Sequence, residues 1–142
     1  MAVFFKRLMS CHCQINKTNQ LLTYMDNFRN SIPDWAFGMN CAVTVCDADG
    51  VILYMNEKAL ETFASRGDMR GRNLFPCHNE RSKSIMRRML DTGESNTYTI
   101  TKHGRRKIIY QTPWRADGRI AGLVEISIEL PDDMPHYDRD KK

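Results

Sequence analysis

The sequence has no apolar run approaching the ~20 residues that a membrane-spanning helix needs. Its first residues are not typical of a secretory signal, because the charges of Lys6 and Arg7 follow the short apolar run instead of preceding it. Residue 2 is Ala2, so the glycine required for N-myristoylation is missing. The five cysteines are odd in number and form no regular framework, which favours reduced thiols. We therefore expect a soluble cytoplasmic protein that does not bind membranes.

Recognisable catalytic motifs are also missing. The chain has no Gly-x-Ser-x-Gly elbow, no glycine-rich phosphate loop and no His-Glu-x-x-His motif. The donors of Cys11-His12-Cys13 are contiguous and have no second ligand pair at zinc-finger spacing, so we expect no metal site. Cys77 and His78 are adjacent and lack an orienting third group, which argues against a nucleophilic pair. The sequence therefore predicts a protein that is not an enzyme.

Composition indicates one small domain. A hydrophobic content of 42% in 142 residues is enough for a single packed core. Lys and Arg outnumber Asp and Glu between residues 57 and 119, and such an excess can attract nucleic acid. No recognition helix flanked by a turn is evident, however, and aromatic residues are not interleaved with the basic ones. We expect a solvated basic surface and no nucleic-acid partner.

The most informative stretch begins at residue 42. Residues 42–46 and 51–54 are typical of two short strands, and Asp49-Gly50 between them is a hairpin turn signal. Asn56 then stands where a helix N-cap belongs. Apolar side chains at helical spacing follow it, namely Ala59, Leu60, Phe63 and Ala64.

Later segments predict one more helix and three more strands. The helix should run from Asn79 to Thr92 and stop at Gly93. Residues 97–102, 107–114 and 123–130 alternate between apolar and polar side chains, which predicts strands. In the last strand we expect the apolar set to face the core: Val124, Ile126, Ile128 and Leu130.

This order of elements resembles the PAS domain family. The specific matches are Asp47 to Asn56, Gly71 to Phe75, and the final strand after Asp117-Gly118. The resemblance implies an α+β fold: a five-stranded antiparallel sheet, helices packed on one face, and the first strand between the second and the last. It implies sensing or interaction, and it does not name the signal.

The resemblance also suggests a division of the chain. We expect a poorly defined leader in residues 1–20, an amphipathic helix and linker in 21–39, a PAS domain in 40–130 and a polar tail in 131–142. Many family members continue from the last strand into a signalling helix. Here the tail holds two prolines and no heptad, so we expect no output module after it.

The N-terminal helix carries an apolar stripe that ends at Pro33. Two interpretations are open, because the stripe can pack on its own domain or pair with the same helix of a second subunit. PAS domains commonly carry such a helix at a dimer interface, so the resemblance favours a homodimer. The predicted interface residues are Leu21, Leu22, Met25, Phe28 and Ile32.

A ligand pocket would lie between the sheet and the two helices. The same side chains would fill the core if no ligand bound. The candidates are Val45, Leu53, Leu60, Phe63, Leu74, Met86, Leu90, Tyr98, Tyr110, Ile126 and Ile128.

Cys77-His78 precedes the second helix, where PAS domains place groups that touch the pocket. Haem-binding family members use a histidine on that helix, so His78 is a candidate haem ligand. Cys77 is a candidate redox-sensitive thiol. The plainer interpretation is that His78 caps the helix and Cys77 is simply buried.

Two hypotheses about function follow. The first is a sensory module that binds a small molecule or cofactor and signals to an unidentified partner protein in trans, in transcriptional or two-component regulation. The second is a ligand-free interaction and dimerisation module. The sequence identifies neither the ligand nor the partner.

Overall fold

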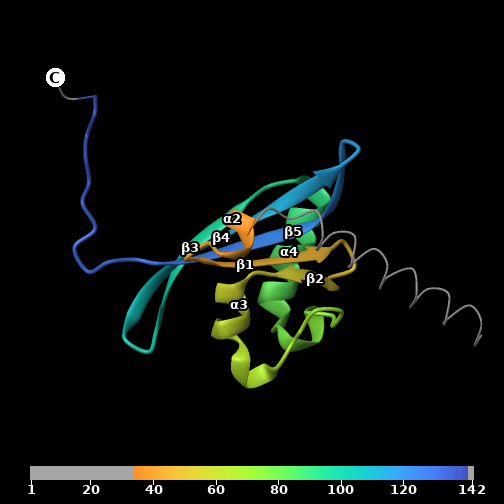
Figure 1. Cartoon of the computed structure of the whole chain (residues 1–142). Coiled ribbons are helices and arrows are strands. Elements are labelled where there is room, and N and C mark those ends of the chain that lie inside the picture. Colours follow the sequence, from red (N-terminus) through yellow and green to blue (C-terminus); the bar gives the residue numbers. More distant parts are fainter. Residues whose placement is uncertain (1–33, 141–142) are drawn as a thin grey trace, which may run out of the picture.

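The computed structural model describes residues 34–140, and within them a sheet of five strands with helices on one face (Figure 1). Three α-helices, two 3-10 helices and five strands follow one another along these residues. In chain order they are α2 (Asp34–Phe37), β1 (Ala42–Asp47), β2 (Ile52–Met55), α3 (Glu57–Thr62), η1 (Ala64–Arg66), η2 (Phe75–Cys77), α4 (Glu80–Thr92), β3 (Asn96–Lys102), β4 (Arg105–Ala116) and β5 (Arg119–Glu129).

The sheet has the strand order β2-β1-β5-β4-β3, and every neighbouring pair is antiparallel. The first strand therefore lies between the second and the last, as the resemblance implied. The predicted α+β fold with a five-stranded antiparallel sheet is confirmed. The predicted amphipathic helix and its interface residues Leu21, Leu22, Met25, Phe28 and Ile32 lie outside the described residues.

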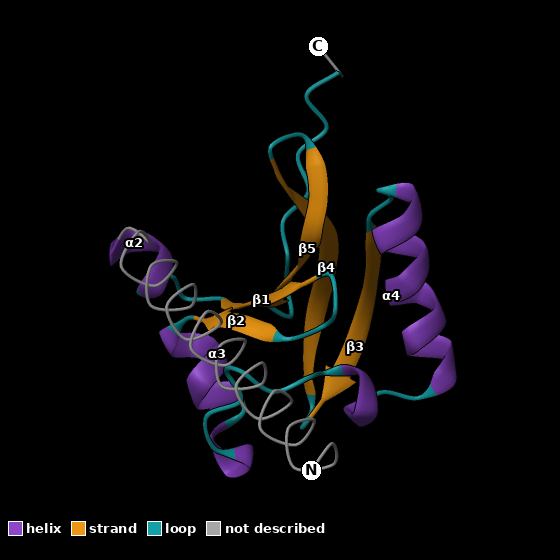
Figure 2. Cartoon of the chain, turned by 90° about the vertical axis from the view of Figure 1, so that its right-hand side faces the viewer, coloured by secondary structure: helices purple, strands orange, loops and turns teal. Residues whose placement is uncertain are grey.

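Both longer helices cover the same face of the sheet (Figure 2). Helix α3 packs on β1 and β2, whereas α4 packs on β5 and β4. Two apolar clusters form beneath them. One contains Ala42, Ile52, Met55 and Ala59, and the other contains Cys46, Met86, Met89 and Leu123. Each helix thus packs over its own apolar cluster on the covered face of the sheet.

Helix α3 begins as the sequence predicts, whereas α4 begins one residue later than predicted and has Asn79, not His78, as its cap. Asn56 caps α3 by accepting a hydrogen bond from Ala59 N at 2.9 Å, and Asn79 caps α4 by accepting one from Ser82 N at 2.9 Å. Helix α4 ends at Gly93, whose φ of 79° lies in the left-handed region that glycine tolerates best.

The turn between β1 and β2 anchors a later part of the chain. Asp47 Oδ1 accepts hydrogen bonds from Asp49 N at 3.0 Å and Val51 N at 2.8 Å, which closes the turn. Asn73 Nδ2 donates to the Asp49 carbonyl at 2.7 Å, and Leu74 N donates to the Gly50 carbonyl at 2.9 Å. The Asp-Gly turn therefore holds the segment that leads into η2.

The predicted orientation of the last strand is wrong. Antiparallel pairing places Thr44 opposite Glu125 and Val43 opposite Ile126, and side chains of directly paired residues share a face. Because Leu123 packs on α4 and strand side chains alternate, Leu123 and Glu125 face the helices. Ile126 and Ile128 face the other way, and Ile128 is 42% exposed.

Residues 131–140 contain no helix or strand. Across residues 34–140, no helix has the length and apolar character needed to cross a bilayer.

Candidate functional site

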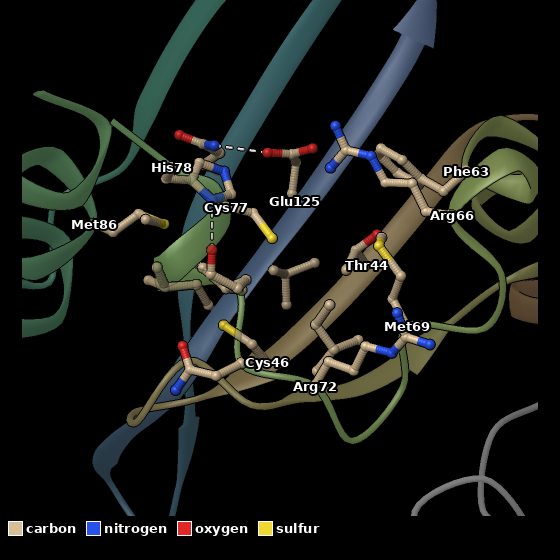
Figure 3. Close-up of a pocket in the computed structure, with 16 residues that line it drawn as sticks. Thr44, Cys46, Phe63, Arg66, Met69, Arg72, Cys77, His78, Met86 and Glu125 are labelled. Atoms are coloured by element: carbon tan, nitrogen blue, oxygen red, sulfur yellow. Dashed lines mark hydrogen bonds between the residues drawn. The ribbon is translucent and has the colours of Figure 1, made fainter. Parts of the chain in front are cut away.

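A cavity of about 640 Å³ lies between the sheet and the helices that cover it. This volume falls within the range of roughly 300–1,000 Å³ typical of small-molecule sites. Strands β1, β4 and β5 form its floor, while α4, η2 and the segments around α3 and η1 supply its walls (Figure 3).

Much of the cavity lining is apolar. It combines aliphatic, aromatic and thioether side chains, from Ile52, Phe63, Met69, Leu74, Met86 and Leu123. Met69 and Met86 enter from opposite sides in Figure 3, and methionine adapts readily to the shape of a bound group. Such walls suit the apolar body of an organic molecule.

A chain of three polar side chains crosses the floor. Asn96 Nδ2 donates to Gln111 Oε1 at 2.8 Å, and Gln111 Nε2 donates to Glu125 Oε2 at 2.7 Å. The strand register explains the chain, because Asn96 pairs with Gln111 and Gln111 pairs with Glu125. The chain ends at the Glu125 carboxylate, which lines the cavity together with Gln111.

Two arginines stand at the edge of the cavity. Arg66 ends η1 and Arg72 lies in the segment held by the Asp-Gly turn, and both line the cavity. In Figure 3 the Arg66 guanidinium group points toward the Glu125 carboxylate. The side chains of Arg66 and Arg72 have no ion-pair partner among the described residues.

His78 and Cys77 both line the cavity, beside η2. The His78 ring places Nδ1 2.7 Å from the Leu74 carbonyl, which accepts a hydrogen bond when Nδ1 carries the proton. That tautomer leaves Nε2 as an acceptor or a metal ligand. Cys77 is exposed, so the interpretation of it as a buried residue is wrong. It ends η2 and lies before the α4 cap at Asn79, outside the first turn of α4.

Burial fixes the protonation of one cavity thiol. Burial, together with smaller repulsion from Asp47 and Glu125, raises the pKa of Cys46 to about 11. Burial and the negative charge of Glu125 also raise the pKa of the Tyr98 hydroxyl. Cys46 is therefore a neutral thiol near pH 7 and a poor nucleophile.

The structure brings some of the predicted site residues to the cavity. Phe63, Leu74, Met86, Cys77 and His78 line it. The remaining candidates do not, and these are Val45, Leu53, Leu60, Leu90, Tyr98, Tyr110, Ile126 and Ile128. Leu60 and Leu90 pack instead against the two apolar clusters beside the cavity. Tyr110, Ile126 and Ile128 were misplaced for the reason given above, because they lie on the other face of the sheet.

Sequence reasoning missed most of the lining, including nearly all of its polar residues. The missed residues are Thr44, Cys46, Ile52, Arg66, Met69, Arg72, Asn73, Gln111, Leu123, Val124 and Glu125. The alternation of β5 contained the relevant signal, because Glu125 and Ile126 necessarily face opposite ways. Within residues 34–140, no group of three or more His, Cys, Asp or Glu side chains is arranged to hold a metal ion.

Fold and cavity together define a class: a small α+β domain with a ligand-sized space between its sheet and its helices. Residues 37–132 match the family model described as the PAS fold, which covers more than half of the chain, and the chain belongs to this family. The predicted PAS resemblance is thus confirmed. No curated protein sequence matches the chain.

Solved structures show the same fold. VqmA from Vibrio cholerae aligns with a TM-score of 0.59 and 21% identity, over 69% of this chain and 49% of VqmA. The chain thus spans about half the length of VqmA, whose structures include a dimer and a complex with ligand and DNA. The Aer2 receptor from Vibrio cholerae, described as a dual PAS-heme oxygen sensor, aligns with a TM-score of 0.52 and 17% identity, over 66% of this chain and 97% of that one. At these identities the comparisons establish the fold.

Proposed function

We propose that this chain is a PAS sensory module that binds a small organic molecule in its cavity and signals the bound state to a partner protein in trans. The single observation that carries the proposal is the cavity of about 640 Å³, which its own side chains leave unfilled. A ligand-free interaction module would gain stability from a filled core, because interior voids forfeit packing contacts.

The lining supports binding in preference to chemistry. Apolar walls surround a few polar groups, the usual composition of a site that orients a ligand. The proposal includes no catalytic step. Output would come from differential affinity of the ligand for two arrangements of the domain, since a ligand can shift an equilibrium only by that difference. A transcriptional regulator or a two-component protein would be the receiver.

The test fills the cavity. Thr44 lies on β1 and lines the cavity floor, so Thr44→Phe should occupy the space that a ligand needs. We expect wild-type protein to bind members of a panel of small aromatic compounds, observed as amide chemical-shift changes by NMR. Thr44→Phe should lose that binding while its spectrum stays dispersed.

Thr99→Phe is the matched control, because Thr99 is exposed on β3 and does not line the cavity. It should bind the panel as the wild-type protein does. Absence of binding to the wild-type protein would favour the ligand-free interaction module. Equal binding by Thr44→Phe would place the site elsewhere.

A cofactor version of this function has one specific observation in its favour. Metal-ligating histidines usually donate their other ring N–H to a carbonyl or carboxylate, and His78 Nδ1 lies 2.7 Å from the Leu74 carbonyl. His78 Nε2 therefore fits an axial ligand for haem, the cofactor in the description of the Aer2 receptor. A Soret band that His78→Ala removes and Cys77→Ala retains would select this version. After addition of hemin, a spectrum that remains the sum of free hemin and protein would exclude it.

A further inference from the structure

We propose that the cavity selects ligands that carry an N–H or O–H hydrogen-bond donor next to an oxygen acceptor on a compact apolar body, and that Glu125 is the residue that accepts from the donor. The inference rests on the proposed function, because it assigns a ligand chemistry to the same cavity. It concerns three features: a carboxylate with one uncommitted oxygen, a fixed amide behind it, and a cationic side chain facing it.

Among the described residues, hydrogen bonds engage only one of the two oxygens of the Glu125 carboxylate. Its Oε2 atom accepts from Gln111 Nε2 at 2.7 Å. Its Oε1 atom accepts no hydrogen bond from any described residue, although the side chain extends into the cavity in Figure 3. An ionised carboxylate is an acceptor only, with about four lone-pair sites. The floor of the cavity therefore presents an acceptor that a ligand donor can satisfy.

The hydrogen bonds that link Asn96, Gln111 and Glu125 fix which atom of the Gln111 amide faces Glu125. The Gln111 oxygen is already engaged by Asn96 Nδ2 at 2.8 Å, so its amide nitrogen must face Glu125. A flipped Gln111 amide would lose both hydrogen bonds at once. Because the three residues lie side by side on neighbouring strands, the carboxylate is held in place before a ligand arrives. Such preorganisation reduces the entropy lost on binding.

Arg66 supplies the hydrogen-bond donor for the oxygen acceptor of the ligand. Its guanidinium group points toward Glu125 in Figure 3, and the two groups form no ion pair within 4.0 Å. A ligand between them can donate to Glu125 and accept from Arg66 with neighbouring atoms, as a primary amide does. A ligand with acceptors alone would leave the desolvated Oε1 atom of Glu125 without a donor, which costs affinity. The apolar body would contact Phe63, Met69 and Met86.

Benzamide and methyl benzoate are suitable probes, because they share the ring and the carbonyl and differ in the N–H donors. We expect the full chain to bind benzamide about tenfold more tightly than methyl benzoate, the effect of one hydrogen bond to a charged group. Dissociation constants would come from NMR titration of the backbone amides. This ratio tests the proposal in the wild-type protein and does not depend on a variant that folds.

Glu125→Gln should invert the preference. In that variant one oxygen can still accept from Gln111, so the new amide nitrogen faces the cavity as a donor. Methyl benzoate should then bind at least as tightly as benzamide. Glu129→Gln is the matched control, because it removes the same charge from the same strand at a residue that does not line the cavity. It should retain the tenfold ratio.

The outcomes separate this inference from the function on which it rests. If both probes bind equally well, and Glu125→Gln changes neither, the cavity binds ligands but Glu125 does not select them. That result overturns the inference and leaves the sensory function standing. If neither probe shifts any amide resonance up to its solubility limit, the inference is overturned, and binding of another compound of the aromatic panel would leave the sensory function standing.

Discussion

The side chain of Asn56 links separate parts of the fold by hydrogen bonds. Its side chain is fully buried, with 0% of its surface exposed. Oδ1 accepts from Ala59 N at 2.9 Å and from Val43 N at 2.9 Å, and Nδ2 donates to the Cys41 carbonyl at 2.8 Å. One amide therefore ties the start of α3 to β1 and to the chain that enters β1. The sequence pattern indicated only the first of these roles.

We expect Asn56→Ala to lower the free energy of unfolding by about 3 kcal/mol, because it removes a helix cap and leaves buried backbone groups without partners. Urea denaturation followed by circular dichroism would measure the loss. Asn79→Ala is the matched control, since Asn79 caps α4 from an exposed position. That change should cost about 1 kcal/mol. Equal losses in the two variants would show that Asn56 acts as a cap alone.

At the scale of the elements, the sequence predicts the positions of the strands and helices well. It predicts poorly which side chains lie on the face of the sheet that the helices cover. The Asp-Gly turns, the Asn56 cap and Gly93 are local signals, and local backbone chemistry determines what they do. Alternation along β5 likewise identifies a strand. Alternation does not state which face the helices cover, and we assigned the more apolar face to the core.

The structure reverses that assignment because the helix-covered face is not uniformly apolar. Gln111 and Glu125 lie on it and are paired across strands, whereas Ile126 and Ile128 lie on the opposite face. A paired polar group can face a cavity because its partner compensates part of its lost hydration. Such pairing depends on strand register, which residues far apart in the sequence determine together. For this reason most of the polar lining was missed.

Gly122 permits the close approach of three strands. A Cβ atom at this position would lie 1.9 Å from the Cys46 carbonyl oxygen and 2.6 Å from Trp114 Nε1. The same indole nitrogen donates to the Cys46 carbonyl at 2.9 Å and so links β4 to β1 across β5. Any side chain at residue 122 would displace this hydrogen bond and the backbone beside it.

We therefore expect Gly122→Ala to lower the free energy of unfolding by at least about 3 kcal/mol, within the range of severe steric substitutions. Gly118→Ala serves as the control, because its added Cβ would meet nothing within 4 Å and only its φ of 76° is unfavourable. Its cost should be about 1 kcal/mol. Thermal denaturation of the two variants would check this, and similar melting temperatures would contradict the steric explanation.

At the scale of the whole molecule, a domain with the proposed sensory function needs a surface through which a bound ligand is reported. The sequence places an apolar stripe on a predicted helix just before the described domain, and we propose that it forms a homodimer interface. Leu22→Glu combined with Phe28→Glu should then give a monomer, because both changes bury charge at the interface. Light scattering would measure the mass.

Thr23→Glu combined with Asn27→Glu is the matched control, since it adds the same charge at positions off the predicted stripe. The control should remain dimeric. A stripe variant that keeps the dimer mass would indicate that the stripe packs within its own subunit. In that case the interface would have to be sought on another part of the surface.

The hydrogen bond between Trp114 and the Cys46 carbonyl also gives this protein an optical property. The chain holds two tryptophans, and Trp35 is 67% exposed, whereas Trp114 is attached to a residue whose side chain lines the cavity. We therefore expect a ligand that contacts Cys46 to change the emission of the Trp114 indole. In a Trp35→Phe variant, which lacks the solvent-exposed tryptophan, the intrinsic fluorescence of the unlabelled protein should then report ligand binding in the cavity.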